Sequence, residues 1–173
     1  MNWKQVVPIV LLAPAMAFAQ ARGPSDAQIA GIVVAANQID IDAGEIAKAR
    51  SKRKEVQDFA QQMITDHTAV NKQAAALAGR LGVKPQESDT SKRLKQAAAD
   101  TTSKLKALKG AQFDKAYVDN EVAFHQQVLD AIDKLLLPSA QNAELKGLIT
   151  KVRPAIAAHL EHARHLQASL AKK

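Results

Sequence analysis

Apolar side chains recur every three or four residues along most of this chain, and that helical spacing limits the fold to an all-α one. The clearest stripe runs from residue 56 to residue 81, where intervals of four and three residues alternate. Its members are Val56, Ala60, Met63, His67, Val70, Ala74, Leu77 and Leu81. Such a stripe forms the seam of an antiparallel helix bundle. No alternation of period two occurs, so the sequence predicts no strands.

Local start and stop signals divide the stripes into four long helices and one shorter helix. Ser25 is a good N-cap for a first helix that runs to about Arg50, and a polar turn at 51–54 follows. Gly82 ends the second helix. The remaining helices are predicted at 91–109, which is shorter and lysine-rich, at 111–137 and at 142–170. Pro154 lies inside the last helix, so we expect that helix to be kinked or divided there.

The N-terminal segment has the features of a secretory signal peptide. Lys4 gives a positive start, residues 6–16 form a short apolar run, and residues 17–19 (AFA) are a small-residue cleavage motif. Cleavage after Ala19, or after residue 21 in a second frame, leaves one helical-bundle domain at 22–173. The apolar run is shorter than the roughly 20 residues of a membrane-spanning helix. We therefore expect a periplasmic or secreted protein, with a buried N-terminal helix as the alternative.

Composition excludes several kinds of chemistry. The chain has no cysteine, so disulfides, thiol catalysis and cysteine-ligated clusters are excluded. No glutamate stands three residues before a histidine, so the duplicated Glu-x-x-His motif of di-iron carboxylate bundles is absent, as is HExxH. No general base or substrate pocket can be named. The sequence therefore predicts no catalytic residue and favours a protein that is not an enzyme over an oxidase or hydrolase.

Four polar side chains interrupt the apolar stripes, each on a different helix. They are Asp40, His67, His125 and His159. A buried carboxylate is costly unless a cation, a histidine or a metal ion accompanies it. One carboxylate and three imidazoles suit a divalent transition metal such as Zn, Fe, Mn or Cu. The alternative is that the histidines are structural residues of the core.

Four further residues are candidates for accessory roles at such a site. Asp66 would orient the adjacent His67 or pair with a surface charge, and His162 would be an alternate ligand on the last helix. Tyr117 is expected to be a core residue with a tethered hydroxyl. Glu121 is expected to face solvent, with a ligand role as the alternative.

The axial positions of the four central residues argue against a common centre. Counted from the turn that joins their helices, Asp40 and His67 differ by a height of about 8 Å at 1.5 Å per residue. Counted in the same way, His125 and His159 differ by about 9 Å. The sequence therefore leaves open whether the four side chains meet.

The formal net charge is +7, and six cations gather on the lysine-rich helix. They are Lys92, Arg93, Lys95, Lys104, Lys106 and Lys109. No aromatic residue lies between them, so we expect no nucleic-acid partner. The two alternatives for this surface are an anionic envelope surface as partner and an ordinary solvated face.

A set of residues from both halves of the chain matches the pattern of a known family. The first half is carried by Ala35, Ala36, Asn37, Asp40, Ile41, Gly44, Ala47, Val56, Phe59, Ala60, Met63, Asp66 and His67. The second half is carried by Phe113, Asp114, Tyr117, His125, Pro154, His159 and Leu160. From about Ser25 to Leu170, the chain resembles the secreted bacterial family called domain of unknown function 4142.

This resemblance implies an exported protein with no established activity and an antiparallel ferritin-like four-helix bundle with one additional short helix. It places the family's acidic position, more often a glutamate, on Asp40, and its recurring histidines on His67, His125 and His159. Our leading hypothesis is an exported bundle that binds a metal ion in its core, with a role in stress or in the envelope. The alternative is a periplasmic chaperone-like or envelope-interacting protein with structural histidines.

Overall fold

The computed structural model describes residues 23–172, and the regular secondary structure of this part is helical throughout. The long helices are α1 (Asp26–Arg50), α2 (Lys54–Leu81), α4 (Gly110–Ala131) and α6 (Ala143–Ala171). The additional helix is α3 (Asp89–Ala107), and α4 continues through η1 (Ile132–Leu136) into α5 (Leu137–Ser139). The predicted signal peptide at 1–19, with its alternative cut at 21, lies outside the described residues. None of the helices described combines the length and apolar character needed to cross a membrane.

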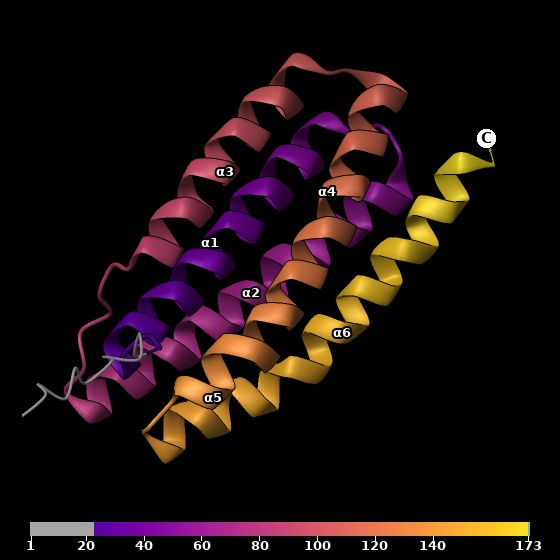
Figure 1. The fold of residues 1–173 in the computed structure, drawn as a ribbon. Coiled ribbons are helices and arrows are strands. Elements are labelled where there is room, and N and C mark those ends of the chain that lie inside the picture. Colours follow the sequence, from indigo (N-terminus) through magenta and orange to yellow (C-terminus); the bar gives the residue numbers. More distant parts are fainter. Residues whose placement is uncertain (1–22, 173) are drawn as a thin grey trace, which may run out of the picture.

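The four long helices form a bundle in which neighbouring helices are antiparallel (Figure 1). One hairpin is α1 with α2 and the other is α4 with α6, while α2 packs on α6 and α1 on α4. Because α2 and α4 point the same way, the chain must return along the bundle between them, and α3 makes this crossover against α1. A single long crossover is the ferritin-like arrangement. The predicted four-helix bundle with one additional helix is confirmed.

Short sequence signals set the ends of these helices. The Ser25 hydroxyl accepts a hydrogen bond from the N–H of Gln28, whose side chain accepts one from the N–H of Ser25. Gly82 ends α2 in the left-handed conformation, with φ at 62°. Asn142 caps α6 by accepting two N–H groups of its first turn. The helix bounds therefore follow the predicted ones closely.

The last helix is not divided at Pro154, because α6 continues through that residue. The proline lacks an N–H group, so the carbonyl oxygen of Thr150 loses its partner in the helix. A second irregularity is η1, where the N–H of Leu137 reaches the carbonyl oxygen of Ile132 and widens the helix by one residue.

Two apolar clusters fill the bundle, one toward the α1–α2 turn and the other toward the α4–α6 turn. The first includes Ala47, Phe59 and Val118, and the second includes Ile32 and Leu129. Every long helix passes from one cluster to the other at a polar side chain. Those side chains are Asp40 on α1, His67 on α2, Glu121 and His125 on α4, and His159 on α6. The polar group is thus closed off from water at both ends of the bundle.

The hairpin of α1 and α2 is especially tight one turn beyond Asp40. A Cβ added at Gly44 would lie 3.0 Å from the carbonyl oxygen of Ala60 and 3.0 Å from Cγ1 of Ile64. The missing side chain of Gly44 therefore lets the two helices approach closely. This approach brings Asp40 within reach of His67.

Candidate metal centre

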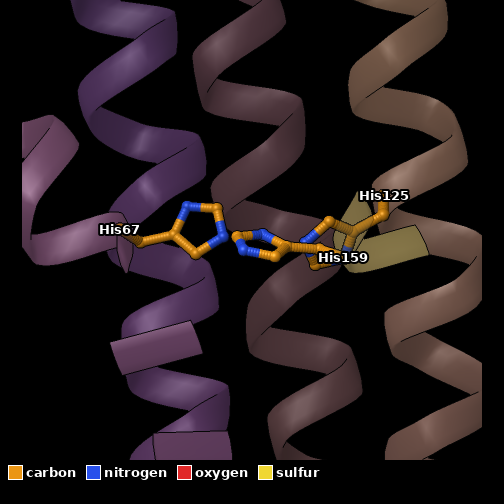
Figure 2. Close-up of side chains that lie close together, drawn as sticks. All are labelled: His67, His125 and His159. Carbon is orange, nitrogen blue, oxygen red and sulfur yellow. The ribbon is translucent and has the colours of Figure 1, made fainter. Parts of the chain in front are cut away.

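Five polar side chains from four helices meet in the middle of the bundle, and none is more than 4% exposed. One ring nitrogen of each of His67, His125 and His159 lies within 4.8 Å of the corresponding nitrogen of the other two. Figure 2 shows the three imidazole rings facing one another. Ligand atoms of Asp40, Glu121 and His125 also lie within 4.8 Å of one another. The four residues singled out from the sequence do meet, and Glu121 joins them.

The axial positions predicted from the sequence argued against this meeting, and that argument is wrong. It counted a rise of about 1.5 Å for every residue of the turns, although only helical residues have that rise. Helix α1 ends at Arg50 and α2 begins at Lys54; α5 ends at Ser139 and α6 begins at Ala143. Counted from these ends, the two offsets fall to about 5 Å and about 3 Å. Such offsets are within the reach of side chains.

The ring of His67 is fixed from outside by an amide. Its Nδ1 lies 2.7 Å from Oδ1 of Asn37, and Nδ2 of Asn37 donates to Oδ1 of Asn71 at 3.1 Å. Because an amide oxygen only accepts, Nδ1 of His67 carries a proton and donates it. Its Nε2 therefore faces the centre, 2.5 Å from Oδ2 of Asp40. The role of Asn37 was missed from the sequence; its position three residues before Asp40, on the same helix face, was the available signal.

The other two histidines follow the same plan. Nδ1 of His125 donates to the carbonyl oxygen of Glu121 at 3.0 Å, and its Nε2 lies 3.4 Å from Oδ2 of Asp40. Nε2 of His159 donates to Oδ2 of Asp66 at 2.9 Å, which leaves Nδ1 for the centre. In all three rings the inner nitrogen is buried and faces the centre, and those of His67 and His125 lie against Oδ2 of Asp40. Metal-binding histidines have this arrangement, because the outer hydrogen bond fixes the tautomer and the orientation of the ring.

Burial also keeps two of these rings in the form that binds metals. It lowers the pKa of His125 and of His159 below the ordinary value, and the charge of His67 lowers both further. Neutral imidazole is the ligand form, so this environment favours metal binding over protonation at the two rings.

The two carboxyl groups of the centre have opposite pKa shifts. Burial raises the pKa of Glu121 well above its ordinary value, and the charge of Asp40 raises it further. Burial also acts to raise the pKa of Asp40, but the hydrogen bond and charge of His67 outweigh it and lower the pKa to about 2. Asp40 is therefore the ionised group, and Glu121 retains a proton more readily. The expectation that Glu121 faces solvent is wrong, since it is 0% exposed.

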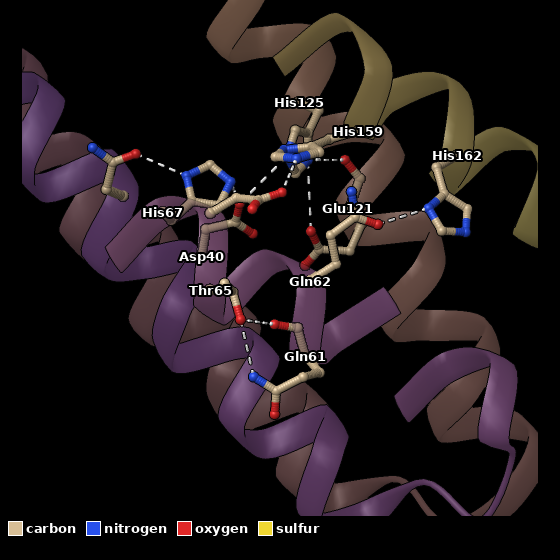
Figure 3. Close-up of polar contacts among 11 residues, drawn as sticks. Asp40, Gln61, Gln62, Thr65, His67, Glu121, His125, His159 and His162 are labelled. Atoms are coloured by element: carbon tan, nitrogen blue, oxygen red, sulfur yellow. Dashed lines mark hydrogen bonds and ion pairs between the residues drawn. The ribbon is translucent and has the colours of Figure 1, made fainter. Parts of the chain in front are cut away.

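The remaining accessory candidates lie around the centre. Asp66 contacts His159 on α6 and not its chain neighbour His67. His162 is exposed and does not join the centre; its Nδ1 donates to Oε1 of Gln62 at 3.1 Å, as Figure 3 shows.

Tyr117 lies in the first apolar cluster, as expected for a core residue. Its ring stacks on Phe113 with centroids 6.4 Å apart and packs edge-on against Phe59 at 6.3 Å. The expected tether of its hydroxyl is not found among residues 23–172. Burial and the charges of Glu121 and Asp40 raise the pKa of this phenol.

Comparison with known structures supports the bundle. The crystal structure of a predicted secreted protein, DUF305, from Streptomyces coelicolor aligns with a TM-score of 0.69 and 14% sequence identity. The alignment covers 84% of this chain and 93% of that chain, and at this identity the likeness concerns the fold alone. No curated protein matches the chain. A family model described as "Domain of unknown function (DUF4142)" matches residues 11–166. The resemblance found in the sequence is thereby confirmed, and the chain belongs to the DUF4142 family.

Proposed function

We propose that this protein binds one divalent transition-metal ion in the middle of its bundle. The ligands are His67, His125, His159, Asp40 and Glu121. The observation that carries this proposal is the shared orientation of the three histidines. Each donates its outer N–H to an oxygen and directs its other ring nitrogen to the centre.

Charge and polarity support a cation at this point. Both oxygens of Asp40 and both of Glu121 are buried without a hydrogen-bond partner within residues 23–172. Each unsatisfied buried polar group costs on the order of 1–3 kcal/mol, and a bound cation offsets that cost. Two carboxylates neutralise a divalent ion, and the mixture of imidazole and carboxylate suits Zn, Fe, Mn or Cu.

We propose a binding role and not a catalytic one, in an exported protein that acts in stress or in the envelope. Five protein ligands fill a five-coordinate site completely and leave one position of a six-coordinate site, so there is little room for a substrate. Export is supported by the predicted signal peptide at 1–19 and by the description of the structurally similar DUF305 protein as secreted. Both a periplasmic and a secreted location agree with these observations.

Metal analysis and calorimetric titration with Zn²⁺ and Mn²⁺ test the metal site, using protein purified without a histidine tag. We expect about one equivalent per chain, and loss of that equivalent in His67→Ala and His159→Ala. His165→Ala is the matched control, because His165 is exposed on the same helix as His159. The proposal fails if the wild type and the two central variants bind equally little metal, or if His165→Ala loses as much.

A second candidate function is attachment to an anionic lipid surface. The six cations of α3 and the residues after it are all exposed, and α3 lies outside the four-helix bundle. Cosedimentation with vesicles of anionic and of neutral lipid tests this function. We expect binding to anionic vesicles only, weaker at high salt and weaker for Lys104→Glu with Lys106→Glu. Equal cosedimentation with both vesicle types would exclude it.

A further inference from the structure

The buried centre is in contact with a partly exposed acidic side chain. The side chain of Asp66 is 42% exposed, whereas the His159 ring that it binds is 3% exposed. In contrast, the amide that fixes His67 belongs to Asn37, which is buried. The carboxylate of Asp66 therefore touches both solvent and the centre.

The helices α2 and α6 meet here through polar side chains. Asp66 binds His159, so one hydrogen bond crosses between the helices there. One turn away Gln62 binds His162 and makes a second such bond (Figure 3). We call these four residues the polar seam. Toward the two ends of the bundle the centre is enclosed by the two apolar clusters, and the hairpin of α1 and α2 is tight at Gly44.

We propose that the metal ion enters and leaves the centre through the polar seam, and that Asp66 is the first protein ligand that an arriving ion meets. This inference rests on the proposed function. An ion that leaves water needs replacement ligands along its path, and carboxylate and imidazole groups supply them. Passage between apolar clusters offers none, whereas the seam offers the carboxylate of Asp66 and the exposed ring of His162.

Electrostatics strengthen the role of Asp66. The chain carries a net charge of +7, which repels an approaching cation at long range. Within residues 23–172, the carboxylate of Asp66 has no ion pair with lysine or arginine that would cancel its charge. When an ion engages this carboxylate, the hydrogen bond to Nε2 of His159 is released. The ring can then turn about its side-chain bonds and let the ion pass, so entry breaks one hydrogen bond and no covalent bond.

The test is the rate of Co²⁺ binding, followed in a stopped-flow instrument by the visible absorption of the bound ion. Asp66→Asn keeps an oxygen acceptor for His159 and removes the charge, whereas Asp66→Glu keeps the charge. Asp58→Asn is the matched control, because it removes the same charge from the same helix two turns away.

We expect Asp66→Asn to slow association by about 3- to 10-fold at low ionic strength and to flatten its dependence on salt. The bound amount should stay at one equivalent. Asp66→Glu should restore most of the rate, and Asp58→Asn should leave it unchanged. The inference is overturned if Asp66→Asn associates like the wild type and changes dissociation alone, or if Asp58→Asn slows association equally. Absence of Co²⁺ binding by the wild type would instead overturn the proposed function, and the entry route with it.

Discussion

Nε2 of His67 lies 2.5 Å from Oδ2 of Asp40, while Nδ1 of the same ring donates its proton to Asn37. A bare ring nitrogen and a carboxylate oxygen at this distance repel each other through their lone pairs. Only a shared cation, either a proton or a metal ion, turns the contact into an attraction. Metal binding at the centre therefore competes with protons.

Replacing Asn37 tests how far the outer hydrogen bond fixes His67. Asn37→Leu removes the acceptor at Nδ1 and lets the ring turn or change tautomer. We expect metal affinity to fall about 10- to 100-fold, measured by competition with a chelator of known affinity. Asn71→Ala, which loses only the next contact outward, should have a smaller effect. Unchanged affinity in Asn37→Leu would show that the ring is held by packing alone.

Glu121→Gln should change how stability depends on pH in the metal-free protein. The raised pKa of Glu121 means that the folded state keeps a proton above pH 4.5, where the unfolded chain has lost it. Wild-type stability therefore falls as pH rises from about 4.5 toward the folded pKa, and glutamine, which does not ionise, avoids that loss.

Urea denaturation of both proteins at pH 5, 6 and 7, with a chelator present, measures this difference. As pH rises, the free energy of unfolding of the variant should increase relative to that of the wild type by up to about 1.4 kcal/mol per pH unit. The lowered pKa values of His125 and His159 affect the stability of both proteins alike, so to first order their contributions cancel in the difference between the two proteins. A difference between the proteins that stays constant with pH would contradict the assignment of the retained proton to Glu121.

Two glycine-to-alanine substitutions in helices should have effects of opposite sign. At Gly31 on α1, a Cβ would overlap the carbonyl oxygen of Gln86, whose N–H donates to Ala27 on the same helix. We expect Gly31→Ala to destabilise the fold by about 1–3 kcal/mol. Gly147 on α6 has open space around its Cβ position. Gly147→Ala should therefore stabilise by about 0.5–1 kcal/mol, and thermal denaturation of both variants gives the comparison.

Arg50 attaches the crossover helix to the bundle. Its Nη2 donates to the carbonyl oxygens of Lys106 at 2.9 Å and Leu108 at 2.6 Å, and its guanidinium lies over the ring of Phe113. Arg50→Met should lower the free energy of unfolding by about 1.5–3 kcal/mol and speed proteolysis within α3. Metal stoichiometry should not change, because α3 contributes no ligand. Proteolysis at the wild-type rate would show that apolar contacts alone hold α3.

The helices were predictable because each has both a periodic apolar stripe and a local end signal. Ser25, Gly82 and Asn142 act where their chemistry indicates, since capping depends on only a few neighbouring residues. The convergence of the four central residues was not predictable in the same way. It depends on where each helix ends in space, and a turn of three residues was enough to mislead the axial count.

The centre itself was predicted only in part. His67, His125 and His159 were found because a polar side chain in an apolar stripe is conspicuous. Glu121 was expected in solvent because glutamate is usually exposed, although its position one turn before His125 on the same face was a signal. The contact of Asp66 with His159 depends on the rotation of α2 against α6, about which a single sequence says nothing.

The distribution of the ligands over the chain has a consequence for biogenesis. Asp40 and His67 belong to the first hairpin, whereas Glu121, His125 and His159 belong to the second. Neither hairpin alone brings all five ligands together, and His159 lies on α6, the last of the described helices in chain order. A growing chain cannot hold the ion in the manner proposed until α6 has packed against α2. Ion binding in the proposed manner therefore follows the packing of α6, and a bound ion would distinguish completed bundles from incomplete ones.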